Sequence, residues 1–239
     1  MAQIAEYFRS IFFPNLGITL RNVGDHISIG NFEIRFYGIV IMIGFLLAYV
    51  LVTNEAKRTK QNPDMYLDFI LILIIPAILG ARLYYILFRL DQYVVKGDIG
   101  ATIKAMLNIR GGGLAIYGGI IAGIITAIIF CKVRKVNFVL MADTAAFGIL
   151  IGQILGRFGN FFNREAFGAY TNCRMAMAIP LDYYRADGNL DYLERTGVIT
   201  QKMLDNVVTI DGMDCITVHP TFLYESLWNL LLLVFLFIY

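Results

Sequence analysis

The strongest constraint in this sequence is a series of long apolar runs that carry almost no charge. The first extends from Phe36 to about Thr53 without a charged residue, close to the ~20 residues that a helix needs to cross a bilayer. Four more runs cover about Met65–Phe88, Leu114–Phe130, Phe138–Arg157 and the segment that follows His219. With 58% hydrophobic and 16% charged residues among 239, the chain is too apolar for an ordinary soluble domain. The pattern predicts a protein with five membrane-spanning helices.

Clusters of basic residues predict the orientation of these helices. Lys57 and Arg58 follow the first run, and Lys132 and Arg134 follow the third. By the positive-inside rule these ends lie in the cytoplasm, which places the N-terminus outside. The loop of residues 89–113 would then lie outside although it is rich in basic residues. An amphipathic segment between about residues 99 and 109, lying on anionic lipid, would explain that charge.

The fold class expected from this pattern is an all-α, polytopic integral membrane helical bundle with a small extracytoplasmic head insert. Its expected parts are an N-terminal interfacial arm (1–35), a transmembrane core (36–168), the head insert (169–218) and a fifth spanning helix (219–239). The head insert contains seven acidic and four basic residues. Its length favours a small folded unit over a plain linker.

The cysteines and histidines of the chain give no metal-binding spacing, so we expect no metal and no cofactor. Cys173 and Cys215 bracket the head insert. They would form a disulfide in an oxidising compartment, and two unpaired cysteines are the open alternative. The basic residues are scattered and form no stripe with exposed aromatic residues, which argues against a nucleic-acid partner.

The most informative polar segment follows the fourth apolar run. It reads Gly-Arg-Phe-Gly-Asn-Phe-Phe-Asn-Arg-Glu-Ala-Phe-Gly from Gly156 to Gly168. Charged and amide groups are costly beside lipid and are usually retained there for function. Gly148, Gly152 and Gly156 share one helical face just upstream, so a second helix can approach closely there.

This segment resembles the defining motif of the bacterial prolipoprotein diacylglyceryl transferases, Gly-Arg-x-Gly-Asn-Phe-x-Asn-x-Glu-x-x-Gly. Four further blocks resemble the same family in the same order, and together they cover nearly the whole chain. These blocks are Ile34–Gly38, Gly80–Tyr85, Gly112–Gly119 and His219–Glu225.

The resemblance implies an enzyme of bacterial lipoprotein biosynthesis in the cytoplasmic (inner) membrane. The family moves the diacylglyceryl group of phosphatidylglycerol to the thiol of a lipobox cysteine in a prolipoprotein and releases glycerol phosphate. The implied partners are phosphatidylglycerol, the prolipoprotein signal peptide and the bilayer, with the active site on the extracytoplasmic side. The reaction needs a thiolate, and it needs positive charge where the leaving phosphate gains negative charge.

Two sets of candidate site residues follow from the resemblance. The expected catalytic residues are Arg157, Tyr117, Glu165 and Asn160, and the expected substrate-binding residues are Arg157, Tyr37, Arg82, Gly168 and His219. The planar guanidinium of Arg157 can bind two phosphate oxygens, or it can extend to lipid head groups without a chemical role. Asn160 and Glu165 would orient glycerol hydroxyls or hold Arg157, or simply end the helix with hydrogen bonds.

The remaining candidates have open alternatives. Tyr37 and Tyr117 would bind lipid or carry a proton, or belong to an interfacial aromatic belt. Arg82 lies within an apolar run and must face a polar cavity or a partner. His219 would act as a base or begin the last helix. We expect Asn163 and Arg164 to face solvent.

The sequence also departs from the family pattern. Tyr117 stands where many members carry histidine, which leaves the general base open, and Phe147 stands where proline is frequent. Members usually continue into two further spanning helices with a Tyr-Gly-x-x-Arg-Phe-x-x-Glu motif, whereas this sequence ends at Tyr239. A truncated sequence and a catalytically incomplete lipid-binding protein are both compatible with that end. A transporter or channel is the other alternative, although internal repeats are absent from the sequence.

Overall fold

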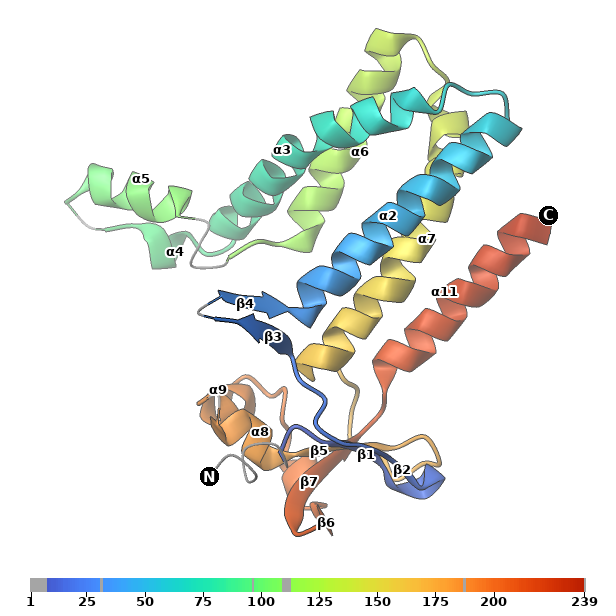
Figure 1. Ribbon diagram of the computed structural model, residues 1–239. Helices are drawn as coiled ribbons and strands as arrows, with labels where there is room; N and C mark the ends of the chain where they lie inside the picture. The colour runs from blue at the N-terminus through green and yellow to red at the C-terminus, as the bar shows by residue number, and fades with distance from the viewer. Residues whose placement is uncertain (1–7, 31, 96, 109–112, 187, 239) are drawn as a thin grey trace. The chain divides into compact units, whose positions relative to one another are not determined.

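The computed structural model describes residues 8–30, 32–95, 97–108, 113–186 and 188–238. The chain forms two compact units, one made of residues 1–48 and 147–239 and the other of residues 49–146. Among the described residues, five helices are long and apolar enough to cross a membrane, in agreement with the five predicted runs. They are α2 (Phe36–Arg58), α3 (Asp64–Leu87), α6 (Ile116–Arg134), α7 (Phe138–Asn163) and α11 (Thr221–Ile238) (Figure 1).

Two of these helices extend further than their apolar runs. α2 continues past Thr53 to Arg58, and α7 continues past Arg157 to Asn163. An apolar run ends at the first polar side chains. The backbone hydrogen bonds of a helix can continue past that point. Arg157 and Asn160 are therefore helical residues of α7 and do not lie in a loop after it.

Small residues allow α3 and α6 to lie against each other in the second unit (Figure 1). A Cβ atom added at Gly80 would lie 2.7 Å from the carbonyl oxygen of Gly118. Cβ atoms at Gly119 and Gly123 would meet α3 at an ordinary 3.5 Å. The closest approach of the two backbones lies at Gly118. By contrast, a Cβ atom at Gly152 would meet nothing within 4 Å, so the expected close approach of a second helix is absent at this glycine.

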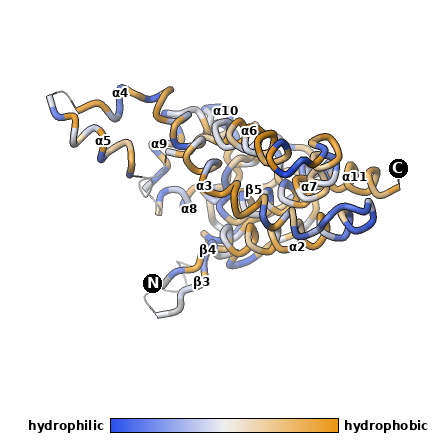
Figure 2. Tube along the Cα trace, turned by 90° about the horizontal axis from the view of Figure 1, so that it is seen from above, coloured by the Kyte–Doolittle hydropathy of each residue, from blue (hydrophilic) through white to orange (hydrophobic). Residues whose placement is uncertain are grey.

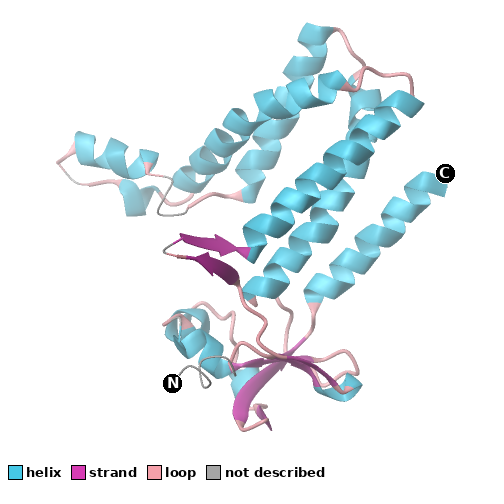
Figure 3. Cartoon of the chain, viewed as in Figure 1, coloured by secondary structure: helices cyan, strands magenta, loops and turns pink. Residues whose placement is uncertain are grey.

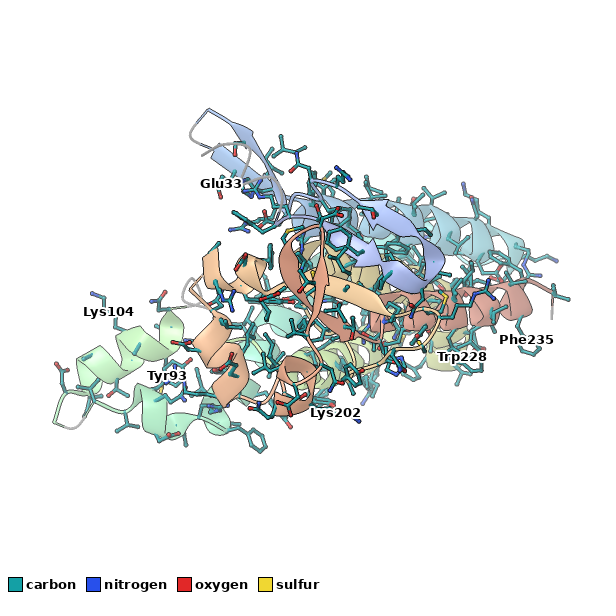
Figure 4. All side chains as sticks on the ribbon, turned by 90° about the horizontal axis from the view of Figure 1, so that it is seen from below. Glu33, Tyr93, Lys104, Lys202, Trp228 and Phe235 are labelled. Carbon is teal, nitrogen blue, oxygen red and sulfur yellow. The ribbon has the colours of Figure 1, made fainter. Side chains whose placement is uncertain are left out.

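The segment between α3 and α6 contains the predicted amphipathic helix. α5 (Ile99–Leu107) follows the short α4 (Leu90–Tyr93), and Asp98 caps α5 by accepting a 2.8 Å hydrogen bond from the Ala101 N–H. The exposed side chains of Ile99, Ile103 and Leu107 recur every four residues and share one face. Tyr93 and Lys104 mark α4 and α5 in Figure 4. Contact of this helix with lipid stays a prediction, and Arg110 and Gly112 lie outside the described residues.

The prediction of an all-α fold is wrong in detail, because the first unit contains a five-stranded antiparallel sheet in the order β2-β1-β5-β7-β6 (Figure 3). Its strands are β1 (Ile11–Phe13), β2 (Ile18–Leu20), β5 (Met177–Pro180), β6 (Val208–Ile210) and β7 (Met213–Val218). A 3₁₀ turn (Pro14–Leu16) connects β1 to β2. Strands this short show little alternation of hydrophobic and polar residues in the sequence. In addition, β1 pairs with β5, which belongs to the distant head insert.

Residues of the head insert pack around a hydrophobic core. Its core consists of fully buried aliphatic side chains, such as Ile11, Ile179, Ile216 and Val218. Three short helices complete it, α8 (Leu181–Ala186), α9 (Leu190–Arg195) and α10 (Gln201–Leu204). Because β1 belongs to this sheet, the N-terminal arm is part of the head core.

A separate hairpin connects the arm to the first spanning helix. β3 (His26–Ile29) pairs with β4 (Phe32–Arg35), with His26 opposite Arg35. The Phe36 N–H at the start of α2 donates a 2.8 Å hydrogen bond to the Asp25 carbonyl. The hairpin therefore brings Asp25, Arg35 and Tyr37 close to one another at the start of α2. Hydrophobic residues then dominate the spanning helices (Figure 2).

We predict that Gly118→Ala lowers the free energy of unfolding in detergent by about 2 kcal/mol, a typical cost of overpacking. The added methyl group would overlap the backbone of Gly80 and the Cβ atom of Tyr84. Gly119→Ala is the matched control on the same helix, because its methyl group meets neighbours at 3.5 Å or more. Equal stability of the two variants would contradict the close contact of α3 and α6.

Candidate functional site

Arg157 on α7 forms an ion pair with Glu225 on α11, and 2.5 Å separate Arg157 Nη2 from Glu225 Oε2. The two helices are also linked by the Ser226 hydroxyl, which donates a 2.9 Å hydrogen bond to the Ile154 carbonyl. About a third of the Arg157 side chain is exposed, at 33%. Each charge thus has a partner, while the guanidinium stays accessible to a ligand.

Glu165 lies near the end of the motif segment, and one of its carboxylate oxygens accepts hydrogen bonds from two amides. Its Oε1 accepts hydrogen bonds from Asn160 Nδ2 at 3.0 Å and Asn163 Nδ2 at 3.1 Å. Arg157 and Asn160 are three residues apart on α7 and share a face. No side chain among the described residues donates to Glu165 Oε2. This oxygen can accept a hydrogen bond from a ligand.

Arg164 is buried, so the expectation that it faces solvent is wrong; 1% of this residue is exposed. Its guanidinium donates to the carbonyls of Phe162 at 3.0 Å, Arg9 at 2.5 Å and Val23 at 2.6 Å. Burial lowers the pKa of this guanidinium, and the nearby Tyr183 opposes that shift. The left-handed backbone at Arg164, with φ of 50°, follows the last residue of α7. The turn directs the side chain inward, which residue type alone did not indicate.

A polar cavity of about 360 Å³ lies beside the end of the motif segment. Asn163 and Glu165 line it together with residues of two other segments: Asp25, Arg35, Tyr37, Tyr183 and Asn189. A hydrogen bond of 2.7 Å joins Asp25 Oδ1 to His26 Nδ1, and Asp25 also forms an ion pair with Arg35. Burial alone would raise the pKa of Asp25, but the hydrogen bond from His26 and the charge of Arg35 outweigh it and lower the pKa. Asp25 is therefore ionised at neutral pH.

Two glycines of the motif are explained by close packing. A Cβ atom at Gly159 would lie 2.6 Å from Cδ2 of Tyr37. One at Gly168 would lie 2.8 Å from Cβ of His219, and the Gly168 N–H donates a 3.0 Å hydrogen bond to the His219 carbonyl. Gly159 thus seats the Tyr37 ring against α7, and Gly168 brings the end of the motif against the residues that begin α11.

His219 faces Tyr224, and 3.2 Å separate His219 Nδ1 from the Tyr224 hydroxyl oxygen. The same hydroxyl lies 3.9 Å from Cys173 Sγ. Cys173 and Cys215 are both free, and Cys215 is completely buried. The structure therefore contains the unpaired alternative for these two cysteines.

Arg82 and Tyr117 belong to the second unit. Arg82 is buried, and its guanidinium donates to the carbonyls of Met106 at 2.8 Å and Gly113 at 2.9 Å and to the Tyr93 hydroxyl at 3.1 Å. Tyr117 is 65% exposed, and its ring lies 6.3 Å from that of Tyr84. Arg82 thus holds the backbone of the segment that leads to Tyr117.

Sequence reasoning missed several residues of the cavity and did not foresee the partner of Arg157. Asp25, Tyr183 and Asn189 lie outside the motif blocks, and no pattern singled them out. Glu225 was visible as the last residue of the His219–Glu225 block. Its role as counter-ion required knowledge of which helix packs beside α7.

Comparison with known proteins gives the family of the chain. The family model described as "Prolipoprotein diacylglyceryl transferase" matches residues 25–239. The chain belongs to the prolipoprotein diacylglyceryl transferase family. The resemblance inferred from the motif blocks is thereby confirmed, and with its five apolar helices the chain is a multi-pass membrane protein.

Curated relatives in this family carry the name phosphatidylglycerol–prolipoprotein diacylglyceryl transferase. The relative from Clostridium perfringens, numbered 1 in its name, is 40% identical over 88% of this chain and 69% of its own length. The relative from Oceanobacillus iheyensis is 39% identical over 87% of this chain and 64% of its own length. The relative from Streptococcus pneumoniae is 42% identical over 86% of this chain and 66% of its own length. The matched part of the chain thus spans about two thirds of the length of these transferases.

We predict that Arg164→Met lowers the free energy of unfolding by about 3 kcal/mol, because it leaves buried carbonyl oxygens without donors. The apolar stem of the side chain is retained, so the loss reports on hydrogen bonds. Arg174→Met is the control, since Arg174 is exposed in the same part of the fold. Denaturant unfolding in detergent measures both variants, and an unchanged Arg164→Met protein would contradict the anchoring role.

We predict that iodoacetamide alkylates Cys173 in the folded protein and leaves Cys215 unmodified. Hydrogen bonds, foremost from Thr171, lower the pKa of the Cys173 thiol, so its thiolate forms at lower pH than usual. Burial raises the pKa of Cys215 to about 12. The labelling rate of Cys173 should therefore reach half its maximum at a lower pH than that of an ordinary free thiol. Faster labelling of Cys215, read by peptide mass spectrometry, would contradict this arrangement.

Proposed function

We propose that this protein transfers the diacylglyceryl group of phosphatidylglycerol to the thiol of a lipobox cysteine in a prolipoprotein. Membership of the family supports this activity, and the accessible Arg157 guanidinium at the polar end of α7 is the observation that carries it. The protein would act in the bacterial cytoplasmic membrane with its motif segment on the extracytoplasmic side. Phosphatidylglycerol would enter from the bilayer, and the prolipoprotein would approach through its signal peptide.

The reaction joins the cysteine sulfur to the terminal glyceryl carbon of the lipid. The bond between that carbon and the phosphate oxygen breaks, and the phosphate leaves with the electron pair as glycerol phosphate. The thiol gives up its proton before or during attack, since the thiolate is the nucleophile. The two requirements on the protein are therefore a proton acceptor and positive charge at the leaving phosphate.

Arg157 supplies the positive charge in this proposal. The planar fork of its guanidinium matches two phosphate oxygens. Glu225 holds the guanidinium between α7 and α11. The phosphate would share or displace that carboxylate, so the cation is already oriented before substrate arrives.

The other candidates have supporting roles. Asn160 and Glu165 form a hydrogen-bonded pair one turn from Arg157 and would orient the glycerol part of the lipid. Tyr37 would bind beside them, and Gly168 and His219 would shape the site where the motif meets α11.

Tyr117 is the candidate proton carrier in the position where histidine is frequent in the family. A phenol is a weak base, so this role requires a cation near the ring hydroxyl. Arg82 would act on the substrate through the segment that leads to Tyr117. Its guanidinium holds the carbonyl of Gly113, which lies just before Tyr117 in the chain.

We predict that Arg157→Lys lowers kcat at least ~100-fold, because an ammonium group cannot replace two-pronged binding of the leaving phosphate. Turnover of phosphatidylglycerol and a lipobox peptide, read as thioether product and released glycerol phosphate, measures the effect. The control is Arg134→Lys, which alters another arginine–carboxylate pair, with Asp68, outside the motif.

Arg134→Lys should keep turnover within about twofold of the wild-type value, because an exposed ion pair contributes little to stability. Unchanged turnover in Arg157→Lys would remove the assigned role of Arg157. Absence of thioether product from the full-length enzyme would remove the proposed function itself.

A further inference from the structure

An apolar groove lies between α3 and α6, two neighbouring helices of the second unit (Figure 1). Its volume is about 360 Å³, within the range of small-ligand sites. The lining residues are apolar except for one hydroxyl and one guanidinium: Ile72, Pro76, Thr126, Ile129, Phe130, Val133 and Arg134. None of them belongs to a motif block, so the proposed transfer reaction does not account for this groove.

The interior of the groove favours an apolar group. Among the lining residues that the structure describes, Thr126 carries the one hydroxyl, and it already donates a 2.7 Å hydrogen bond to the Ala122 carbonyl of its own helix. Phe130 is buried, with 5% exposed, whereas Ile129 and Val133 are 56% and 73% exposed. Phe130 thus forms the floor of the groove, and the two aliphatic side chains form its rim. A lipid acyl chain matches such a surface.

A cation and a carboxylate lie together at one end of the groove. Arg134 Nη2 donates a hydrogen bond to Asp68 Oδ2, and about half of each side chain is exposed, 51% and 46%. The guanidinium carbon of Arg134 also lies 5.7 Å from the centre of the Phe130 ring. In the described part of the chain, Arg134 Nη1 and Asp68 Oδ1 have no hydrogen-bond partner. A ligand can therefore bind both charges without separating them.

The order of these groups along the helices matches that of a phospholipid in the cytoplasmic leaflet. Asp68 and Pro76 are eight residues apart on α3, or about 12 Å along a helix axis. The charged pair lies near the ends of α3 and α6 that the positive-inside rule assigns to the cytoplasm. The apolar lining continues from the pair toward the middle of the span. A head group at the pair would therefore direct its acyl chain along the groove.

The charges favour a zwitterionic head group over an anionic one. An anionic lipid would be attracted by Arg134 and repelled by Asp68. The charges nearest in sequence are Asp64, Lys132 and Lys135. Of these, Lys132 is two residues from Arg134 and faces another side of α6. A phosphate beside Arg134 and an ammonium beside Asp68 would satisfy both members of the pair. A primary ammonium donates hydrogen bonds to a carboxylate, whereas a trimethylated one has no N–H to donate.

We infer that this groove binds a zwitterionic phospholipid with a primary ammonium group, such as phosphatidylethanolamine, from the cytoplasmic leaflet. One acyl chain lies in the groove, the phosphate accepts hydrogen bonds from Arg134, and the ammonium donates to Asp68. The site uses no motif residue, and the inference does not rest on the proposed function. A lipid bound in this way contacts both α3 and α6 near their cytoplasmic ends.

The test uses phosphatidylethanolamine with a photoreactive acyl chain, added to the full-length protein in detergent. Irradiation should place adducts on the groove peptides of α3 and α6, located by peptide mass spectrometry. Unlabelled phosphatidylethanolamine should compete about tenfold more effectively than phosphatidylglycerol or phosphatidylcholine with the same acyl chains, the effect of one charge-assisted hydrogen bond.

Two variants examine the two parts of the site. Asp68→Asn should make phosphatidylglycerol the better competitor, because Arg134 then acts without a neighbouring carboxylate. Thr126→Phe should lower the adduct yield on the groove peptides about tenfold, because the ring fills the space of the acyl chain. The controls are Asp143→Asn, which removes an exposed carboxylate of the same unit, and Ile128→Phe, which adds a ring on α6 outside the lining. Neither control should change labelling or competition.

Three results would overturn the inference. The first is equal competition by the three lipids in the wild-type protein, and the second is an unchanged preference for phosphatidylethanolamine in Asp68→Asn. The third is a set of adducts on other helices with none on the groove peptides, since another part of the full-length protein would then cover the groove. Thioether formation is a separate readout: its failure would reject the proposed function and leave the lipid result unaffected.

Discussion

A charge at the edge of a bilayer needs a partner, and the pairing of Arg157 with Glu225 meets that requirement. The pair joins α7 to α11 and keeps a guanidinium in a fixed place without burying it. An arginine held in this way is oriented for a phosphate, while a free side chain would first have to lose its conformational freedom. The proposed chemistry depends on this interaction more than on any other.

Two glycines of the motif permit close contacts with distant segments. Gly159 accommodates Tyr37, and Gly168 accommodates His219. Arg164 adds a buried anchor that connects the end of α7 to the N-terminal arm through the carbonyls of Arg9 and Val23. The motif therefore specifies how three distant segments meet, in addition to supplying polar groups.

The spanning helices and the family could be predicted from sequence because both signals are local. An apolar run such as Phe36–Thr53 requires no knowledge of its neighbours, and neither does the motif from Gly156 to Gly168. The sheet could not be predicted, since β1 is three residues long and pairs with a strand from the head insert. The inward turn of Arg164 depends on a left-handed backbone, and Asn189 reaches the cavity only through the fold of the insert.

The central claim is that Arg157 binds the lipid phosphate. Solid-state NMR can measure it directly, as a dipolar coupling between the phosphorus of bound phosphatidylglycerol and the guanidinium nitrogens of Arg157 in isotope-labelled protein. The account predicts a separation of about 4 Å, as expected for a charge-assisted hydrogen bond to a phosphate oxygen. Saturating lipid without measurable coupling, and with the pairing to Glu225 intact, would contradict it.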